Sequence, residues 1–592
     1  MEEQPQPAQP TPQETPASSA ESTEHSKTTG GRWRHWHRFQ AWYGARKKWA
    51  IPSSVLIFIL ILAGLPWTRF PIAGLVLKNN FTVKVLDSTA NTAVSGAIVN
   101  IGSASATTNG NGLATLHVKV GHHKVVVSKK YYKNSTVSYT VPILKQKTSP
   151  NIMLTATGRQ VKISVTNQIN NKALSDVDIQ VADVTAKTDQ TGNAIVVVPV
   201  GAASYKVKLR ATGYNDSTTE IQVSNDKIQQ NNIRLTPAGK IYFLSKLSGT
   251  IDVVKTNLDG TNRQTVLAGT GAEDQFNTVL LASKDWKFLA LLSKRAGDSP
   301  ALYLIDTSSD KMTNIDTGDA TFDLVGWSGH NFVYTVYRNN YTNIQPHAQA
   351  LKSYDADAMQ LTLLDQTNAT GTLDNWAHEN YATGQAYLSG DNVIYIKFWQ
   401  TGNSTVDQSV VAGKQDAIYS IGVDGKNAQT LKTFGASSYN DRSFESIPYK
   451  ANTYYYRVTD PAGTSYFNYS TGKLSDASDL SNSFNDYYQN PAVTYLQSPS
   501  GNSSFWSEAR DGKNVLFVGG QNGDNTKQIA TLSDYTVYGW YTDNYLLVQK
   551  DDSELYIMPV GGIKNDSQAI KVSDYHKPSL NFYGYGGGYG GL

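Results

Sequence analysis

The side chains that most often perform chemistry in enzymes are sparse and scattered along this chain. There is no cysteine among the 592 residues, which excludes a thiolate nucleophile and a cysteine-ligated metal. No G-x-S-x-G sequence is present, and Gly326-Trp327-Ser328-Gly329 is one residue out of register for such a nucleophile turn. No H-E-x-x-H sequence is present either. The sequence therefore predicts no catalytic residue, no metal site and no cofactor.

Carboxylates remain as the groups from which an acid–base site could be assembled in space. A hydrolase or lyase acting on envelope polysaccharide would need clustered carboxylates at the mouth of its site. The candidates for such a cluster are Asp306, Asp355, Asp374 and Glu379. Residues 521–525 are the nearest approach to a calcium loop, but they offer one carboxylate and lack the closing acid.

Aromatic side chains offer a different chemistry, which is binding through ring faces. Sugars pack their apolar faces on aromatic rings while neighbouring polar groups take the hydroxyls. Tyrosine is also a common strand residue, so the same rings could instead fill the space between sheets. The candidate ligand-binding residues are Tyr341, His347, Trp376, His378, Trp399, Tyr454, Tyr456, Tyr466 and Tyr487.

The composition indicates many short strands joined by polar turns. Charged residues make up 17% of the chain, and 35 residues are tyrosine. From about residue 239 onward, a unit of several apolar strands joined by polar turns recurs every 35–50 residues or so, and its clearest copy is Leu280 to Ile315. Radial repetition of four-stranded sheets hides strand edges, so this region, 239–583, is predicted to be a β-propeller of about seven blades. The candidate binding loops are 341–350, 371–385 and 402–415.

A second repeat, offset by about eighty residues, precedes this region. Phe81-Thr82-Val83-Lys84-Val85 matches Val161-Lys162-Ile163-Ser164-Val165 as an alternating strand. Val118 to Val127 likewise matches Val198 to Leu209, each with a turn glycine. Period-two apolarity between Asn, Asp and Gly turns predicts two small antiparallel β-sandwiches, at 80–156 and 158–237.

These motifs resemble known families. The strand-turn with its glycine, Gly121 or Gly201, resembles the carboxypeptidase-regulatory-like and PEGA sandwiches, and this resemblance implies a non-catalytic spacer or binding module. The turn Ser283-Lys284-Asp285 and the following Arg295-Ala296-Gly297 resemble TolB-type, PD40/WD40-like propeller blades. TolB has six blades, so six is the alternative count. Residues 580–583 are expected to complete the first blade.

The longest apolar run, 49–67, carries no charged residue and follows a basic aromatic segment at 31–48. The run nearly crosses a hydrocarbon core of about 30 Å at about 1.5 Å per residue. It is therefore predicted to be a transmembrane helix, with a cytoplasmic N-terminus by the positive-inside rule and a cleaved signal peptide as an alternative. The anchor residues are Trp49, Leu56, Phe58, Leu60, Leu62 and Trp67.

The remaining segments at the two ends of the chain have low-complexity compositions. Residues 1–30 are rich in Pro, Gln, Glu, Ser and Thr and are expected to be a disordered cytoplasmic tail. Residues 584–592 are a Gly/Tyr-rich tail that cannot fold alone.

The sequence thus predicts a single-pass protein of the bacterial cell membrane that acts by binding. Two sandwiches hold the propeller away from the lipid, and the propeller binds a protein or glycan partner outside the cytoplasm. The net charge of +3 is small, so nucleic acid is not an expected partner. The polysaccharide-acting enzyme and a single-pass surface sensor are the alternatives.

Overall fold

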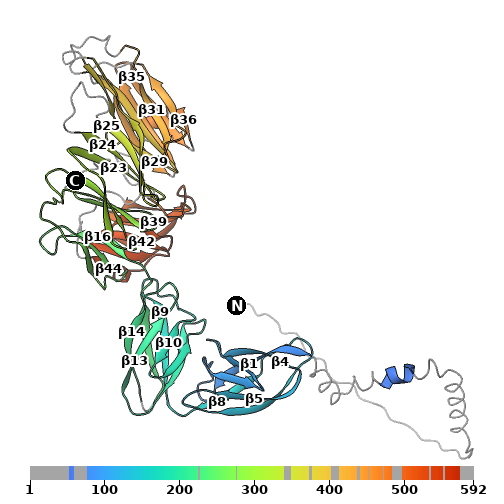
Figure 1. Ribbon diagram of the computed structural model, residues 1–592. Coiled ribbons are helices and arrows are strands. Elements are labelled where there is room, and N and C mark those ends of the chain that lie inside the picture. Colours follow the sequence, from blue (N-terminus) through green and yellow to red (C-terminus); the bar gives the residue numbers. More distant parts are fainter. Residues whose placement is uncertain are drawn as a thin grey trace, which may run out of the picture.

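The computed structural model describes residues 52–58, 77–224, 227–274, 277–338, 349–371, 376–401, 412–435, 441–450, 452–470, 472–482, 496–532, 535–550 and 554–573. Within these ranges nearly all regular structure is β-sheet, which confirms the prediction of a mainly β protein. Small sheets follow one another along the chain, first in two sandwiches and then in a larger group (Figure 1).

The first sandwich consists of two four-stranded sheets over one apolar core. Its strands alternate, so that Leu116 and Val118 point into the core while His117 between them is exposed. One sheet has the order β4 (Leu113–Lys119), β1 (Lys78–Asp87), β8 (Asn151–Ala156), β6 (Tyr132–Lys133). The other has the order β3 (Ala104–Thr107), β2 (Ile98–Ile101), β5 (Gly121–Ser128), β7 (Ser135–Val141).

The second sandwich repeats this plan around its own core. One sheet is β12 (Asn193–Val198), β9 (Arg159–Asn167), β15 (Gln229–Leu235), and the other is β11 (Val184–Lys187), β10 (Asp178–Val181), β13 (Ser204–Arg210), β14 (Ser217–Gln222). The repeat extends to single hydrogen bonds. The buried hydroxyl of Thr108 donates to Val94 O at 2.6 Å, and that of Thr188 donates to Leu174 O at 2.6 Å.

The described residues that follow form seven antiparallel sheets, which we number 1 to 7, where the sequence predicts about seven blades with six as the alternative. Sheet 1 is β16 (Ile241–Ser245), β17 (Asp252–Thr256), β18 (Gln264–Leu267). Sheet 2 is β19 (Val279–Ala282), β20 (Phe288–Ser293), β21 (Ala301–Asp306), β22 (Lys311–Asp316). Sheet 3 is β23 (Ala320–Ser328), β24 (Asn331–Arg338), β25 (Gln349–Asp355), β26 (Gln360–Gln366). Sheet 4 is β27 (Ala369–Gly371), β28 (Trp376–Tyr381), β29 (Tyr387–Ser389), β30 (Asn392–Thr401), β31 (Asp416–Gly422), β32 (Gln429–Phe434).

Sheet 5 is β33 (Ser443–Lys450), β34 (Thr453–Asp460), β35 (Gly463–Ser470), β36 (Lys473–Asp476). Sheet 6 is β37 (Leu496–Gln497), β38 (Ser503–Arg510), β39 (Lys513–Gly520), β40 (Lys527–Leu532). Sheet 7 is β41 (Tyr535–Thr542), β42 (Tyr545–Lys550), β43 (Glu554–Pro559), β44 (Ile570–Ser573), with the short 3-10 helix η2 (Asp566–Gln568) before its last strand. Six of these sheets are meanders in which strands consecutive in the chain are neighbours, whereas in sheet 4 both β28 and β29 pair with β30.

The first and last of these sheets lie side by side, as expected for a propeller-like ring. Sheets 1, 2 and 7 contribute buried residues to one common core. The indole nitrogen of Trp286, in sheet 2, donates to the carbonyl of Tyr541 in sheet 7 at 3.1 Å. β16 is accordingly found beside β42 and β44 in Figure 1, although some three hundred residues separate them in the chain.

The second sandwich is fixed to sheets 1 and 7 by a small joint. Asn167 Nδ2 donates to the Tyr545 hydroxyl at 2.9 Å, and Thr236 Oγ1 donates to Asp259 Oδ2 at 2.6 Å. Between them Ile169 of the sandwich enters the core shared by sheets 1, 2 and 7 and is 2% exposed. The joint therefore combines one buried apolar side chain with two hydrogen bonds.

The predicted transmembrane helix over 49–67 is wrong. In this region the described helix covers 52–58, and among all described residues no helix is long and apolar enough to cross a membrane. Leu56 and Phe58 are exposed on this short helix. The predicted single-pass membrane localisation is corrected with it.

Several sequence-based predictions lie outside the described residues. These are the N-terminal tail at 1–30, the basic aromatic segment at 31–48, the expected closing strand at 580–583 and the Gly/Tyr-rich tail at 584–592. The same holds for the anchor residues Trp49, Leu60, Leu62 and Trp67.

Candidate binding site at the loop end of sheets 3 to 5

Each of the seven sheets has two ends, and the second sandwich lies at one of them. Its partners are Tyr545, at the β41–β42 turn, and Asp259, at the β17–β18 turn. We call this the sandwich end. Because strands alternate in direction, the connections from β24 to β25 and from β30 to β31 lie at the opposite end, as do those from one sheet to the next. We call this the loop end.

Long connections are concentrated at the loop end of sheets 3, 4 and 5. At the sandwich end, the turns between the first strands of these sheets are as short as 329–330, 390–391 and 451–452. At the loop end, the connections are 339–348, 402–415, 435–442 and 477–495, of which residues 339–348, 402–411, 436–440 and 483–495 lie outside the described residues. Binding residues commonly sit on long connections held by a rigid sheet, so this end is the candidate binding site.

A buried group of charges fixes the start of sheet 4 at the loop end. The ammonium of Lys397 lies 2.9 Å from Asp365 Oδ2 and 3.3 Å from Glu379 Oε2. The side chains of Lys397 and Glu379 are 8% and 6% exposed. Burial alone would lower the pKa of Lys397, but the attraction of Asp365 and Glu379 outweighs it and raises that pKa. Lys397 therefore stays charged and ties three strands together.

Neighbouring groups complete this arrangement. Glu379 Oε2 accepts hydrogen bonds from the backbone nitrogen of Asn368 at 3.2 Å and from its side-chain amide at 3.0 Å. Gln349, at the start of β25, accepts from the backbone of Tyr381 at 2.8 Å and donates to Asn380 at 2.9 Å. The strands that flank the connections 339–348 and 372–375 are thus held by side-chain contacts.

A second buried charge pair fixes the strands around the connections 402–415 and 435–442. Asp416, which is fully buried, accepts from the backbone nitrogen of Trp399 at 2.7 Å and from Arg442 Nη1 at 2.5 Å. The other terminal nitrogen of Arg442 donates to Asp460 at 3.2 Å. Arg442 therefore joins sheet 4 to sheet 5, and its planar guanidinium suits such a two-sided contact.

The candidate ligand-binding residues lie in different parts of the structure. Trp399 and His378 are buried at the loop end of sheet 4, where Lys414 Nζ lies 4.8 Å from the Trp399 ring centre. Burial lowers the pKa of His378 to about 4, so the imidazole is neutral at physiological pH. Trp376 belongs to the same strand as His378, β28.

The tyrosine candidates are placed differently. Tyr454 and Tyr456 of β34 are buried in the core between sheets 4 and 5, where Tyr454 packs on Tyr387 with ring centres 5.1 Å apart. Tyr466 of β35 is half-buried. Tyr341, His347 and Tyr487 lie outside the described residues.

The structure does not bring the candidate carboxylates together. Asp306 and Asp355 end β21 and β25 at the sandwich end, where each accepts hydrogen bonds from the backbone of the following turn. Glu379 lies at the loop end and is paired with Lys397. Asp374 lies outside the described residues. Among the described residues there is also no group of three His, Asp or Glu side chains that could hold a metal ion.

Sequence reasoning missed Lys397, Asp416 and Arg442, which organise this end. A signal for two of them was present. Lys397 interrupts the apolar strand Asn392 to Thr401, and Asp416 directly precedes the apolar run Ala417-Ile418. A lone charge within an apolar strand must be paired when it is buried. Which partner it takes depends on the packing of neighbouring sheets, and that is not visible in one sequence.

Comparisons with known proteins give distant likenesses. No protein-family model matches the chain, and no curated protein matches it. A prolyl endopeptidase structure is 12% identical over 60% of this chain and 45% of its own, with a TM-score of 0.32. The β-propeller domain of the trilobed protease from Pyrococcus furiosus is 11% identical over 64% of this chain and 95% of its own, with a TM-score of 0.31.

TolB from Acinetobacter baumannii is 12% identical over 56% of this chain and 78% of its own, with a TM-score of 0.24. This chain spans less than half the length of the prolyl endopeptidase. Because these TM-scores are low, the propeller-like fold of residues 241–573 rests on the successive antiparallel sheets and on the core that joins the first to the last.

Proposed function

We propose that this protein is a binding protein in which two sandwiches support a propeller-like domain that recognises a protein or glycan at its loop end. The observation that carries the proposal is the separation of the two ends of the sheets. The sandwich occupies one end through Asn167, Ile169 and Thr236, and the long connections of sheets 3 to 5 are at the other. A partner at the loop end therefore meets no obstruction from the sandwiches.

The charges beneath the loop end support recognition without catalysis. Lys397 and Arg442 are each bonded to carboxylates, and these pairs connect strands of sheets 3, 4 and 5. Such pairs hold the bases of the connections in fixed positions, and fixed positions lower the entropy lost on binding. Their contribution is to position the loops and not to transfer protons.

The test uses the full chain and two matched variants of sheet 4. In one variant the connection 402–415 between β30 and β31 is replaced by Asn-Gly, and in the other the turn 423–428 between β31 and β32 receives the same replacement. The unmodified chain is first screened on a glycan array and on a panel of purified extracytoplasmic proteins. Affinities for the strongest glycan or protein are then measured for all three chains.

We expect the replacement at 402–415 to weaken binding at least tenfold and the replacement at 423–428 to leave affinity within twofold. Both variants should keep the circular dichroism spectrum of the unmodified chain. Equal affinities of the two folded variants would show that the loop end does not bind. Conversion of the bound glycan into a shorter product would show that the protein is an enzyme acting on that glycan, and would contradict the proposal of a binding protein.

A further inference from the structure

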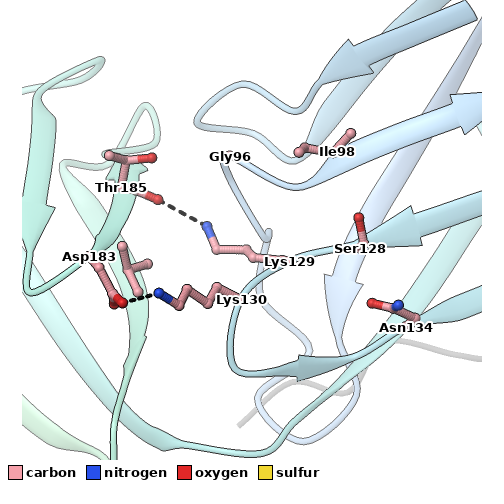
Figure 2. Close-up of a pocket in the computed structure, with 9 residues that line it drawn as sticks. Gly96, Ile98, Ser128, Lys129, Lys130, Asn134, Asp183 and Thr185 are labelled. Carbon is pink, nitrogen blue, oxygen red and sulfur yellow. Dashed lines mark hydrogen bonds and ion pairs between the residues drawn. The ribbon is translucent and has the colours of Figure 1, made fainter.

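A pocket of about 400 Å³ opens where the two sandwiches meet, far from the loop end of the sheets (Figure 2). The first sandwich contributes Ile98, Ser128, Lys129 and Asn134, and the second contributes Asp183 and Thr185. Pockets that hold small molecules in proteins commonly have volumes of this size, and they often lie at the junction of two domains.

Lys129 brings a positive charge to this pocket without a carboxylate to balance it. Its ammonium donates to the carbonyl oxygen of Ser95 and, across the junction, to that of Thr185 at 3.1 Å (Figure 2). Burial lowers the pKa of Lys129 to about 8, and no acidic side chain of the described residues opposes that effect. An ammonium has three N–H groups, so one donor remains after these two contacts.

Asp183, the acidic side chain that lines the pocket, does not balance the charge of Lys129. Asp183 forms an ion pair with Lys130 and also accepts a hydrogen bond from the Tyr131 hydroxyl at 3.0 Å. The negative charge of Asp183 is therefore offset by Lys130, as the dashed contact in Figure 2 shows. An unbalanced charge removed from water costs free energy, and an anion bound beside Lys129 would offset that cost.

Other groups of the pocket fit the remainder of such a ligand. Ser128 and Asn134 supply a hydroxyl and an amide, which can hydrogen-bond to hydroxyl groups. Ile98 is 47% exposed and offers an apolar surface. A small molecule with one carboxylate, several hydroxyls and an apolar ring face would contact all of these side chains.

We propose that the pocket between the sandwiches binds a small carboxylate ligand of the sugar-acid type, with Lys129 as its counter-ion. Because Lys129 also donates to the Thr185 carbonyl of the second sandwich, the ligand would lie at the junction of the two sandwiches. This site is separate from the proposed recognition at the loop end, so either can fail without the other.

Isothermal titration of the full chain at pH 7 tests the site with four probes, which are glucuronate, acetate, sulfate and glucose. Lys129→Met removes the charge, and Lys129→Gln removes it while keeping a donor for the carbonyls of Ser95 and Thr185. The matched control is Lys124→Met, which removes an exposed lysine of β5 in the same sandwich that does not line the pocket. Circular dichroism melting establishes that each variant is folded.

We expect saturable binding of glucuronate, weakened at least tenfold by either change at Lys129 and altered less than twofold by Lys124→Met. Glucose should not bind. Acetate and sulfate show whether the site recognises the sugar part of the ligand or any oxyanion. If both bind as tightly as glucuronate, the site is a general oxyanion site, which would contradict a sugar-acid site. If both bind much more weakly than glucuronate, the site recognises a sugar acid. Absence of glucuronate binding, or equal binding by the folded Lys129 variants, would overturn the proposal.

Discussion

Asn167 of the second sandwich donates a hydrogen bond to the hydroxyl of Tyr545 in sheet 7, at 2.9 Å. The same amide nitrogen donates to Tyr214 within the sandwich at 3.0 Å, and Asn167 Oδ1 accepts from the backbone nitrogen of Ile169 at 2.8 Å. One side chain thus joins the two domains and shapes the turn that inserts Ile169 into the propeller-like core. The sandwich end of the sheets is covered as a result.

Changing Ile169→Ala should loosen this joint. The side chain is buried in the core of sheets 1, 2 and 7, and shortening it to alanine leaves a cavity in that core. Spin labels on Cys variants at exposed Lys206 of the sandwich and Lys311 of sheet 2 can report the distance, because the chain contains no cysteine of its own. We expect a broader distance distribution for Ile169→Ala than for the unmodified chain.

The control is Thr89→Ala in the first sandwich, where the backbone makes the matching turn contact with Asp87. That turn has no propeller beside it, so the distribution should stay narrow. Equally narrow distributions for Ile169→Ala and the control would contradict a joint fixed by Ile169.

Removing the cation at the loop end of sheet 4 should destabilise the propeller-like domain. Lys397→Met leaves Glu379, which is 6% exposed, without its positive partner. Breaking a buried ion pair from one side costs about 3–5 kcal/mol. Chemical denaturation followed by tryptophan fluorescence measures the change.

The matched control is Lys426→Met, which breaks the pair with Asp424 on the sandwich end of the same sheet, where both side chains are largely exposed. Solvent screens such a pair, so stability should hardly change. A similar small effect of both substitutions would show that Lys397 is not needed to balance the buried carboxylates.

The stability of the contact between sheets 2 and 3 should fall as pH rises. His330 Nδ1 lies 2.6 Å from Asp357 Oδ2, and Nε2 lies 3.0 Å from Asp285 Oδ2. Burial alone would lower the pKa of His330, but the hydrogen bonds to Asp357 and Asp285 outweigh it and raise that pKa. The protonated ring therefore stabilises the fold fully below its ordinary pKa of about 6.5, and this contribution disappears as pH rises through the higher folded-state value.

Melting temperatures measured between pH 5 and pH 8.5 test whether the stabilisation by His330 falls as pH rises. The difference between the unmodified chain and His330→Gln should be largest at pH 5 and should shrink towards pH 8.5. A difference that stays constant with pH would mean that the charge of His330 contributes nothing. Asp285 should be left intact in this comparison, since it also accepts from the Ser283 hydroxyl at 2.9 Å.

Local pattern made much of the fold predictable. The strand 81–85 and its copy at 161–165 alternate with period two, and the structure places both as interior strands of equivalent sheets. The turns around Thr108 and Thr188 even share their buried hydrogen bonds. Such features depend on residues close in sequence, which one sequence displays.

The errors and omissions concern features that depend on distant residues or on length alone. The apolar run 49–67 was long enough to predict a membrane helix, but no helix of the described residues is long and apolar enough to cross a membrane. The rings of Tyr454 and Tyr456 look like sugar contacts in sequence, yet the packing of sheets 4 and 5 decides that they are buried. The pairing of Asp416 with Arg442 is likewise a product of neighbouring sheets.

Hydrogen–deuterium exchange of the full chain, with and without the strongest bound glycan or protein, tests the recognition surface most directly. If the loop end binds, protection should appear in peptides covering 376–381, 397–416 and 435–442, while the turns at 390–391 and 423–428 exchange as before. Protection confined to those two turns, or to the sandwiches, would contradict recognition at the loop end.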